Sequence, residues 1–188
     1  LVLKFDNLDP NVKGAAKKIL SSMTSQQGQS FLMYDQMKMF VYGESPNISE
    51  NTTDLRFFIQ FGTGDEYYKL TKPVYDSWDE DRQRNAIDLD LNWLTSLKNL
   101  DEVSIEKINT NDTFIDSLDY KRYQFINENN EEYKKVEIIG NPSLSRLQYF
   151  VVGVENNTDH PITGEIWLDE LRLSGVKKDQ GTAVRLKS

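Results

Sequence analysis

Hydrophobic residues alternate with polar ones in several stretches of this chain, and a period of two predicts β-strands with one face toward a core. Leu1, Leu3 and Phe5 show the pattern at the start of the sequence, and residues 55–61 show it again. By this criterion we predict strands at residues 1–6, 34–44, 55–61, 66–70, 87–91, 123–126, 133–139, 147–154 and 165–173.

Two of these segments, 34–44 and 147–154, are nearly continuous in apolar character, which predicts central strands covered on both faces. Gly-Thr-Gly-Asp at 62–65 is turn chemistry that joins two strands into a hairpin, and the polar residues 127–130 predict a second hairpin. Most strand pairing is therefore expected to be antiparallel.

Two helices are predicted at the edges of this β framework. Asp9 and Pro10 suit an N-cap and the first helical position. The apolar residues that follow fall on one helical face; they are Val12, Ala15, Ala16, Ile19, Leu20 and Met23. A second, short helix is predicted at 93–100, residues 73–85 are expected to be an exposed connection, and residues 101–120 have no clear pattern.

The last predicted strand contains a change of phase. Ile166 and Leu168 share one parity, whereas Leu171 and Leu173 share the other. One extra residue at Asp169-Glu170, a β-bulge, would return all four apolar side chains to the core.

Together these elements predict a mainly β fold: an antiparallel, jelly-roll-like β-sandwich with one or two short peripheral helices. The 188 residues suit one such domain, which we place at residues 1–175, with a C-terminal tail at 176–188. Because the chain starts at Leu1 without an initiator methionine or a signal peptide, we expect it to be a fragment of a larger protein.

Charge and composition narrow the function classes. The net charge of -8 would repel a phosphate backbone, so nucleic acid is not expected as a partner. The absence of cysteine excludes disulfides, thiolate catalysis and cysteine-ligated zinc. No stretch approaches the roughly 20 apolar residues of a membrane-spanning helix, so this segment alone is expected to be soluble.

Four segments of the chain carry a family resemblance. Residues 35–44, 139–145, 152–154 and 165–173 together resemble the SprA family, and the most specific motifs are Asn-Pro-Ser-Leu-Ser at 141–145 and Trp-x-x-Glu-Leu-Arg-Leu at 167–173. The family consists of giant outer-membrane proteins of gliding bacteria of the Bacteroidota that are tied to type IX secretion. One departure is Asp169, where the family usually has Asn.

The resemblance implies a β-barrel translocon with soluble β-sandwich inserts, of which this chain would be one. The tail would lead toward the next barrel segment. The implied location is the cell outer membrane or envelope, on a side left open. The implied partners are other domains of the parent protein and secretion-system components, with secreted cargo as a further candidate.

Catalytic motifs are scarce. His160 is the only histidine, and its place before Pro161 favours a surface turn over a catalytic dyad. Asp88 and Asp90 lie on one face of a predicted strand at a spacing that a glycoside hydrolase could use, but a solvated strand face has the same pattern. We therefore expect a non-enzymatic domain, with a glycoside hydrolase as one alternative.

Two binding sites are considered. Asp6, Asn7, Asp169 and Glu170 would converge if the first and last strands pair, and their oxygens suit a structural calcium ion, the one cofactor considered. Tyr67, Tyr68, Tyr75 and Trp78 could form a flat platform for sugar, and the chain would then be a carbohydrate-binding β-sandwich module. Aromatic residues in strands also pack cores, so that interpretation of the four rings stays open.

Overall fold

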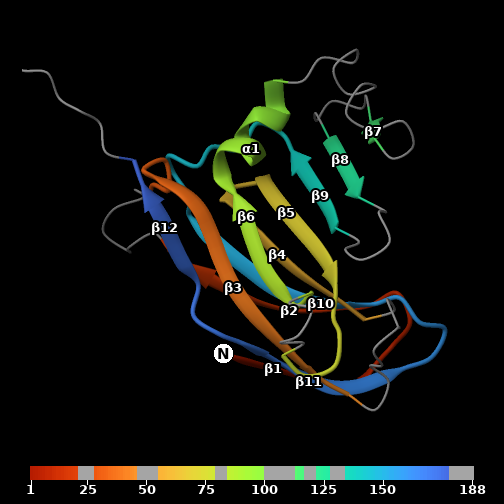
Figure 1. Ribbon diagram of the computed structural model, residues 1–188. Coiled ribbons are helices and arrows are strands. Elements are labelled where there is room, and N and C mark those ends of the chain that lie inside the picture. The colour runs from red at the N-terminus through yellow and green to blue at the C-terminus, as the bar shows by residue number, and fades with distance from the viewer. Residues whose placement is uncertain are drawn as a thin grey trace, which may run out of the picture.

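Two antiparallel β-sheets pack face to face in the computed structural model, which describes residues 1–20, 28–45, 55–78, 84–99, 113–116, 122–127 and 134–177 (Figure 1). The strands are β1 (Val2–Leu8), β2 (Lys13–Ile19), β3 (Tyr34–Glu44), β4 (Leu55–Thr63), β5 (Glu66–Pro73), β6 (Ala86–Asp90), β7 (Thr113–Asp116), β8 (Arg122–Asn127), β9 (Lys134–Ile139), β10 (Tyr149–Asn156), β11 (Ile162–Leu168) and β12 (Arg172–Val176). The predicted antiparallel β-sandwich is confirmed.

Sheet A has the order β1-β11-β3-β12. The strand β6 also belongs to this sheet and pairs with β3 along the edge that does not pair with β12. Sheet B has the order β2-β10-β4-β5-β9-β8-β7. The N-terminal and C-terminal parts of the described chain thus pair in both sheets: β1 pairs with β11 in sheet A, and β2 pairs with β10 in sheet B. The jelly-roll connectivity stays a prediction.

One hydrophobic core lies between the sheets. Met37 and Ile166 from sheet A are fully buried in it, as are Phe61 and Ile138 from sheet B. Full burial of such a side chain contributes about 1.5–3 kcal/mol to stability, so the alternation of apolar residues along each strand is what holds the layers together.

The bulge predicted in the closing segment is confirmed. Leu168 pairs with Val41 and Arg172 pairs with Lys38, so three residues of the closing segment lie opposite two residues of β3. The backbone N–H of Asp169 donates to the Phe40 carbonyl at 3.0 Å. Across the bulge, Leu168 is buried, and Leu171 and Leu173 pack against the core.

The helix predicted from Asp9 onward is wrong in the part that the structure describes. Asn11 has a positive φ of 61°, and β2 then pairs along its whole length with β10. Small residues make that pairing possible, because a Cβ on Gly153 would come within 2.4 Å of the Gly14 carbonyl oxygen. Strand pairing here outweighs a helix propensity worth only tenths of a kcal/mol per residue. Residues 21–27, with Met23, lie outside the described residues.

The other predicted strands and both hairpins are present, and so is the second helix, α1 (Leu91–Ser96), which continues into a 3-10 turn, η1 (Leu97–Asn99). A further strand, β7, falls in the stretch without a clear pattern. Two details are wrong: β3 buries only one face, and Val74 and Tyr75 of the supposedly exposed connection are buried. No described helix has the length and apolar character needed to cross a membrane. Residues 178–188 of the predicted tail lie outside the described residues.

Candidate interaction surface

The outward face of sheet A carries a group of aromatic side chains that are exposed or half-buried. Met37, Met39 and Val41 of β3 point into the core, so Phe40 and Tyr42 between and after them point outward. Trp167 of β11 lies opposite Tyr42 in the register and therefore faces the same side. Trp78, after β5, completes the group by contact with Tyr42. We call these four residues the aromatic surface.

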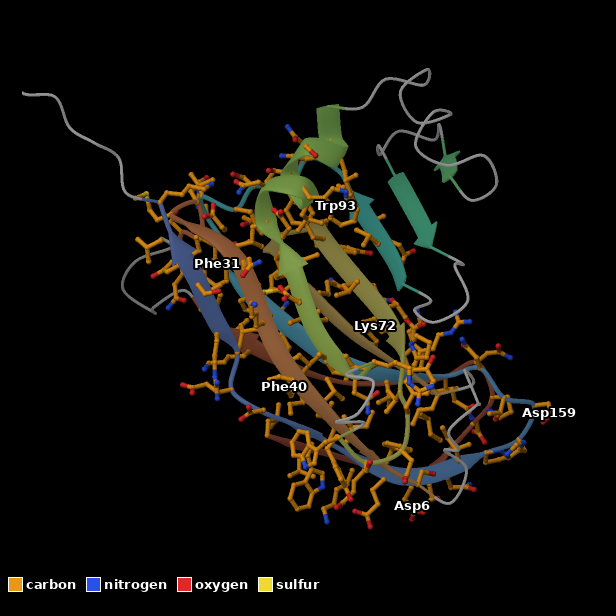
Figure 2. All side chains as sticks on the ribbon, in the orientation of Figure 1. Asp6, Phe31, Phe40, Lys72, Trp93 and Asp159 are labelled. Atoms are coloured by element: carbon orange, nitrogen blue, oxygen red, sulfur yellow. The ribbon has the colours of Figure 1, made fainter. Side chains whose placement is uncertain are left out.

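Within the aromatic surface, the Tyr42 ring contacts the rings of Trp78 and Trp167, and Phe40 and Trp167 remain exposed. The Tyr42 ring centroid lies 5.2 Å from that of Trp78 and 5.6 Å from that of Trp167, with interplanar angles of 55° and 57°. Phe40 is 43% exposed and Trp167 is 44% exposed. Trp93 is also exposed but belongs to α1, away from Phe40, which lies along β3 (Figure 2).

Asn85 fixes the segment that positions Trp78. Its Oδ1 accepts from the Tyr75 N–H at 2.9 Å, and its Nδ2 donates to the carbonyl oxygens of Tyr75 and Ser77 at 2.8 and 3.0 Å. Ser77 in turn exchanges two backbone hydrogen bonds with Gly43 of β3. Because Asn85 is buried, these bonds are shielded from water and hold Trp78 beside β3.

A row of charged residues borders the aromatic surface. Lys4 of β1, Glu165 of β11 and Glu44 of β3 lie opposite one another across three strands. Glu165 accepts from Lys4 Nζ at 2.8 Å and from Trp167 Nε1 at 2.7 Å, and these two bonds lower its pKa. Partial burial, then the charge of Glu44 and more distant carboxylates, raise the pKa of the Tyr42 hydroxyl. The shared bond with Glu165 also raises the pKa of Lys4, so both members of this ion pair stay charged at neutral pH.

A cleft of about 440 Å³ opens beside this charged row. Its lining comes from β1, β11 and the end of β3, and consists of Lys4, Phe5, Asp6, Glu44, Ser45, Thr163, Gly164 and Glu165. Three carboxylates and one ammonium group give the lining a net charge of -2. Figure 2 shows Asp6 near the lower end of the molecule, below Phe40.

The four residues of the predicted calcium site do not come together. Asp6 accepts from Thr163 Oγ1 at 3.1 Å, and the Asn7 N–H donates to the same oxygen at 2.9 Å. Asp169 and Glu170 lie at the other end of β11, because β1 and β11 are antiparallel. The six positions from Thr163 to Asp169 span roughly 20 Å, so the predicted convergence is wrong. Within the described residues, no group of three or more His, Cys, Asp or Glu is placed to hold a metal.

The predicted sugar platform is also divided. Tyr67 and Tyr68 point to opposite faces of β5, and Tyr68 is a core residue whose hydroxyl donates to the Pro142 carbonyl at 2.9 Å. Tyr75 is buried, with the Arg84 guanidinium 3.7 Å from its ring centre. Of these four residues, only Trp78 belongs to the aromatic surface. Its ring contacts that of Tyr42, which in turn contacts the ring of Trp167.

The candidate catalytic residues have structural partners. Asp90 Oδ1 accepts from the N–H groups of Asn92 and Trp93 and caps α1. Asp88 forms an ion pair with Lys38 at 3.0 Å. His160 lies exposed beside Asp159, with its Nδ1 2.9 Å from a carboxylate oxygen. The contacts of Asp88 and Asp90 are those expected of a solvated strand face, and those of His160 are expected of a surface turn, which are the non-catalytic interpretations of the sequence.

A buried ionic cluster on the outward face of sheet B has no signal in the sequence. Lys69 of β5 is 7% exposed, forms an ion pair with Glu155 of β10, and lies 3.8 Å from Glu137 of β9. Its Nζ is also 4.4 Å from the centre of the Phe58 ring. Burial lowers the pKa of Lys69 despite these carboxylates. The cluster joins β5 to its neighbour β9 and, across β4, to β10.

Comparison with protein families gives a match over most of the chain. The family model SprA_N, described as motility related/secretion protein, matches residues 13–187. That range includes β3, β11 and Trp78, and so all four residues of the aromatic surface. None of the curated proteins compared with the chain matches it.

Proposed function

Because this chain belongs to the SprA_N family of motility-related and secretion proteins, we propose that it is a non-catalytic interaction domain of a large outer-membrane protein in type IX secretion and gliding motility. The sandwich serves as a rigid support, and its aromatic surface contacts another polypeptide. The family accounts for the motility and secretion role, and the surface accounts for how this part of the protein takes part in it.

The observation that carries the proposal is the outward-facing aromatic group of sheet A. Large exposed apolar patches bordered by polar residues are typical of protein interaction sites, and Trp and Tyr are enriched among residues that dominate binding energy. Phe40 and Trp167 are exposed and Tyr42 is half-buried on this face, with Lys4 and Glu165 at one border. Lys38 with Asp88 lies at the opposite border.

The proposed partners are other domains of the parent protein and components of the secretion system, with secreted cargo as a further candidate. A motility and secretion family indicates the cell envelope as the location. We extend this to the outer membrane as part of the proposal. A surface that stays exposed on the isolated domain would then be covered in the assembled envelope complex.

Site-specific photocrosslinking in cells tests this function. A photoreactive residue replaces Phe40 or Trp167 in the parent protein, and Asp159, on an exposed loop elsewhere, is the control position. We expect crosslinks from positions 40 and 167 to envelope or secretion proteins, or within the parent protein, and fewer from position 159. Equal crosslinking at all three positions, or recovery of cytoplasmic proteins alone, would overturn the proposal.

A carbohydrate-binding module is the second candidate function, because Trp78 and Trp167 are aromatic side chains on an exposed sheet face. The interplanar angles of 55° and 57° at Tyr42 argue against it, because rings tilted in this way do not form one flat platform for the apolar face of a sugar. A glycan array separates the two functions. Glycan binding that disappears in Trp78→Ala would favour the module, whereas an array without binding favours the protein partner.

A further inference from the structure

We propose that the aromatic surface and the adjacent cleft together bind an extended, basic segment of a partner polypeptide. An arginine side chain of that segment enters the cleft, and an apolar side chain two residues away packs on the aromatic surface. This inference rests on the proposed function, because it takes the outward face of sheet A to be an interaction surface and adds the chemistry of the partner.

Charge selects a basic partner. The cleft presents the carboxylates of Asp6, Glu44 and Glu165 against one ammonium group, that of Lys4. Lys4 and Trp167 hold Glu165 in its ionised form, and the pKa of its carboxyl is lowered accordingly. The whole chain carries a net charge of -8, so the wider field has the same sign as the cleft. An acidic or neutral segment would partly desolvate these carboxylates without adding a positive charge to balance them.

Arginine suits the site better than lysine. Its planar guanidinium can bond a carboxylate through two N–H groups and can also stack on an aromatic ring. Glu44 and Tyr42 offer both kinds of contact within one short stretch of β3, since the Tyr42 hydroxyl lies 3.3 Å from a Glu44 oxygen. A single guanidinium can therefore contact a carboxylate of the cleft and the border of the aromatic surface.

The spacing of the two rows selects an extended segment. The charged row of Lys4, Glu165 and Glu44 lies two residues along each strand from the row of Val2, Trp167 and Tyr42. Two residues of strand cover about 6.6 Å. An extended peptide laid along the strands presents side chains i and i+2 on one face with the same spacing, so the fitting pattern is arginine, any residue, then an apolar residue.

Fluorescence anisotropy with synthetic peptides tests the inference on the 188-residue chain. The probes are labelled, capped Ser/Gly peptides that contain Arg-Ser-Leu, Arg-Ser-Ser-Leu or Asp-Ser-Leu. We expect Arg-Ser-Leu to bind about tenfold more tightly than either of the others and to lose affinity as salt rises. The double variant Glu44→Gln with Glu165→Gln should weaken its binding about tenfold, because the charges disappear while the shapes remain.

Glu170→Gln is the matched control. Glu170 is an exposed carboxylate of the closing segment outside the cleft, so its neutralisation should leave the affinity unchanged. Tryptophan fluorescence of each variant verifies that it is folded. Four results would overturn the inference: equal binding of Asp-Ser-Leu, no effect of the double variant, no binding of Arg-Ser-Leu up to about 1 mM, or binding of glycans in its place.

The two proposals fail separately. If photocrosslinks still form at positions 40 and 167 while the peptide results are negative, the interaction surface stands and only the basic partner is withdrawn. If no specific crosslinks form at these positions, the proposed function fails first.

Discussion

Replacement of Asn85 by alanine should destabilise the chain and release Trp78 from the aromatic surface. Asn85 is 3% exposed, and its side-chain amide makes three hydrogen bonds to the backbone of Tyr75 and Ser77. Asn85→Ala removes all three bonds at once. It leaves the Tyr75 N–H without its acceptor in a buried position, where a polar group without a partner is costly.

The size of the effect follows from these bonds. A protein hydrogen bond contributes about 0.5–1.5 kcal/mol net, so three of them predict a decrease of about 3 kcal/mol in the free energy of unfolding. For a chain of this length, that corresponds to a decrease of about 6–12 °C in Tm. Asn157→Ala is the matched control, because Asn157 is exposed and a surface substitution of this kind changes stability by less than about 0.5 kcal/mol.

Urea unfolding followed by tryptophan fluorescence measures the stability, and near-UV circular dichroism reports on the contact between Tyr42 and Trp78. We expect Asn85→Ala to lower both the midpoint and the near-UV signal. A decrease below about 1 kcal/mol, or a near-UV spectrum equal to that of the unmodified chain, would refute the role of Asn85 as the residue that fixes this segment.

Three further predictions concern the strands. Gly153→Ala should cost about 1–3 kcal/mol because its Cβ would meet the Gly14 carbonyl oxygen at 2.4 Å, whereas Gly14→Ala, with its nearest contact at 3.7 Å, should be nearly neutral in the same urea assay. Burial disfavours the ionised form of Glu155, but the hydrogen bonds from Lys69 and Lys13 and the charges of these two lysines together outweigh burial and lower its pKa below 4.5. The resulting stabilisation is complete above that value and is lost as pH falls through the folded-state pKa. Glu155→Gln should therefore cost about 2 kcal/mol at pH 7, and its deficit should shrink below pH 4.5; a pH-independent deficit would contradict this. Deletion of Glu170 removes the bulge and should cost about 2–4 kcal/mol by turning the apolar side chains of β12 outward, whereas Glu170→Ala, which keeps the chain length, should be tolerated.

Alternation in the sequence was enough to predict most strands, because a period of two is a direct record of which face is buried. The segment around β2 shows where this fails. Ala15, Ala16 and Ile19 fit a helical face, yet the deciding contact is Gly14 against Gly153, between residues far apart in the chain. A single sequence does not show such a contact. A prediction for this segment therefore depends on local propensity, which indicates a helix where the structure has a strand.

The candidate site was harder to predict than the fold. Phe40 lies in a nearly continuous apolar run, so its outward direction follows only once Met39 and Val41 are known to point inward. Tyr67 and Tyr68 are adjacent in the sequence, but adjacent residues of a strand point to opposite faces, so they cannot share one platform. The ion pair of Lys69 and Glu155 joins β5 to β10 across β4, and nothing in either local sequence indicates it.

The closing segment joins the fold to the proposed function. The motif Trp-x-x-Glu-Leu-Arg-Leu spans the bulge and contains two kinds of position, core-facing and outward-facing. Leu171 and Leu173 pack on the core and need only be apolar, whereas Trp167 and Arg172 face outward on the two sides of the bulge. Folding alone does not require a tryptophan at an exposed position, since smaller or polar residues pair equally well on a solvated sheet face. The exposed Trp167 is therefore the residue of this motif that the fold leaves unexplained and that an interaction surface explains.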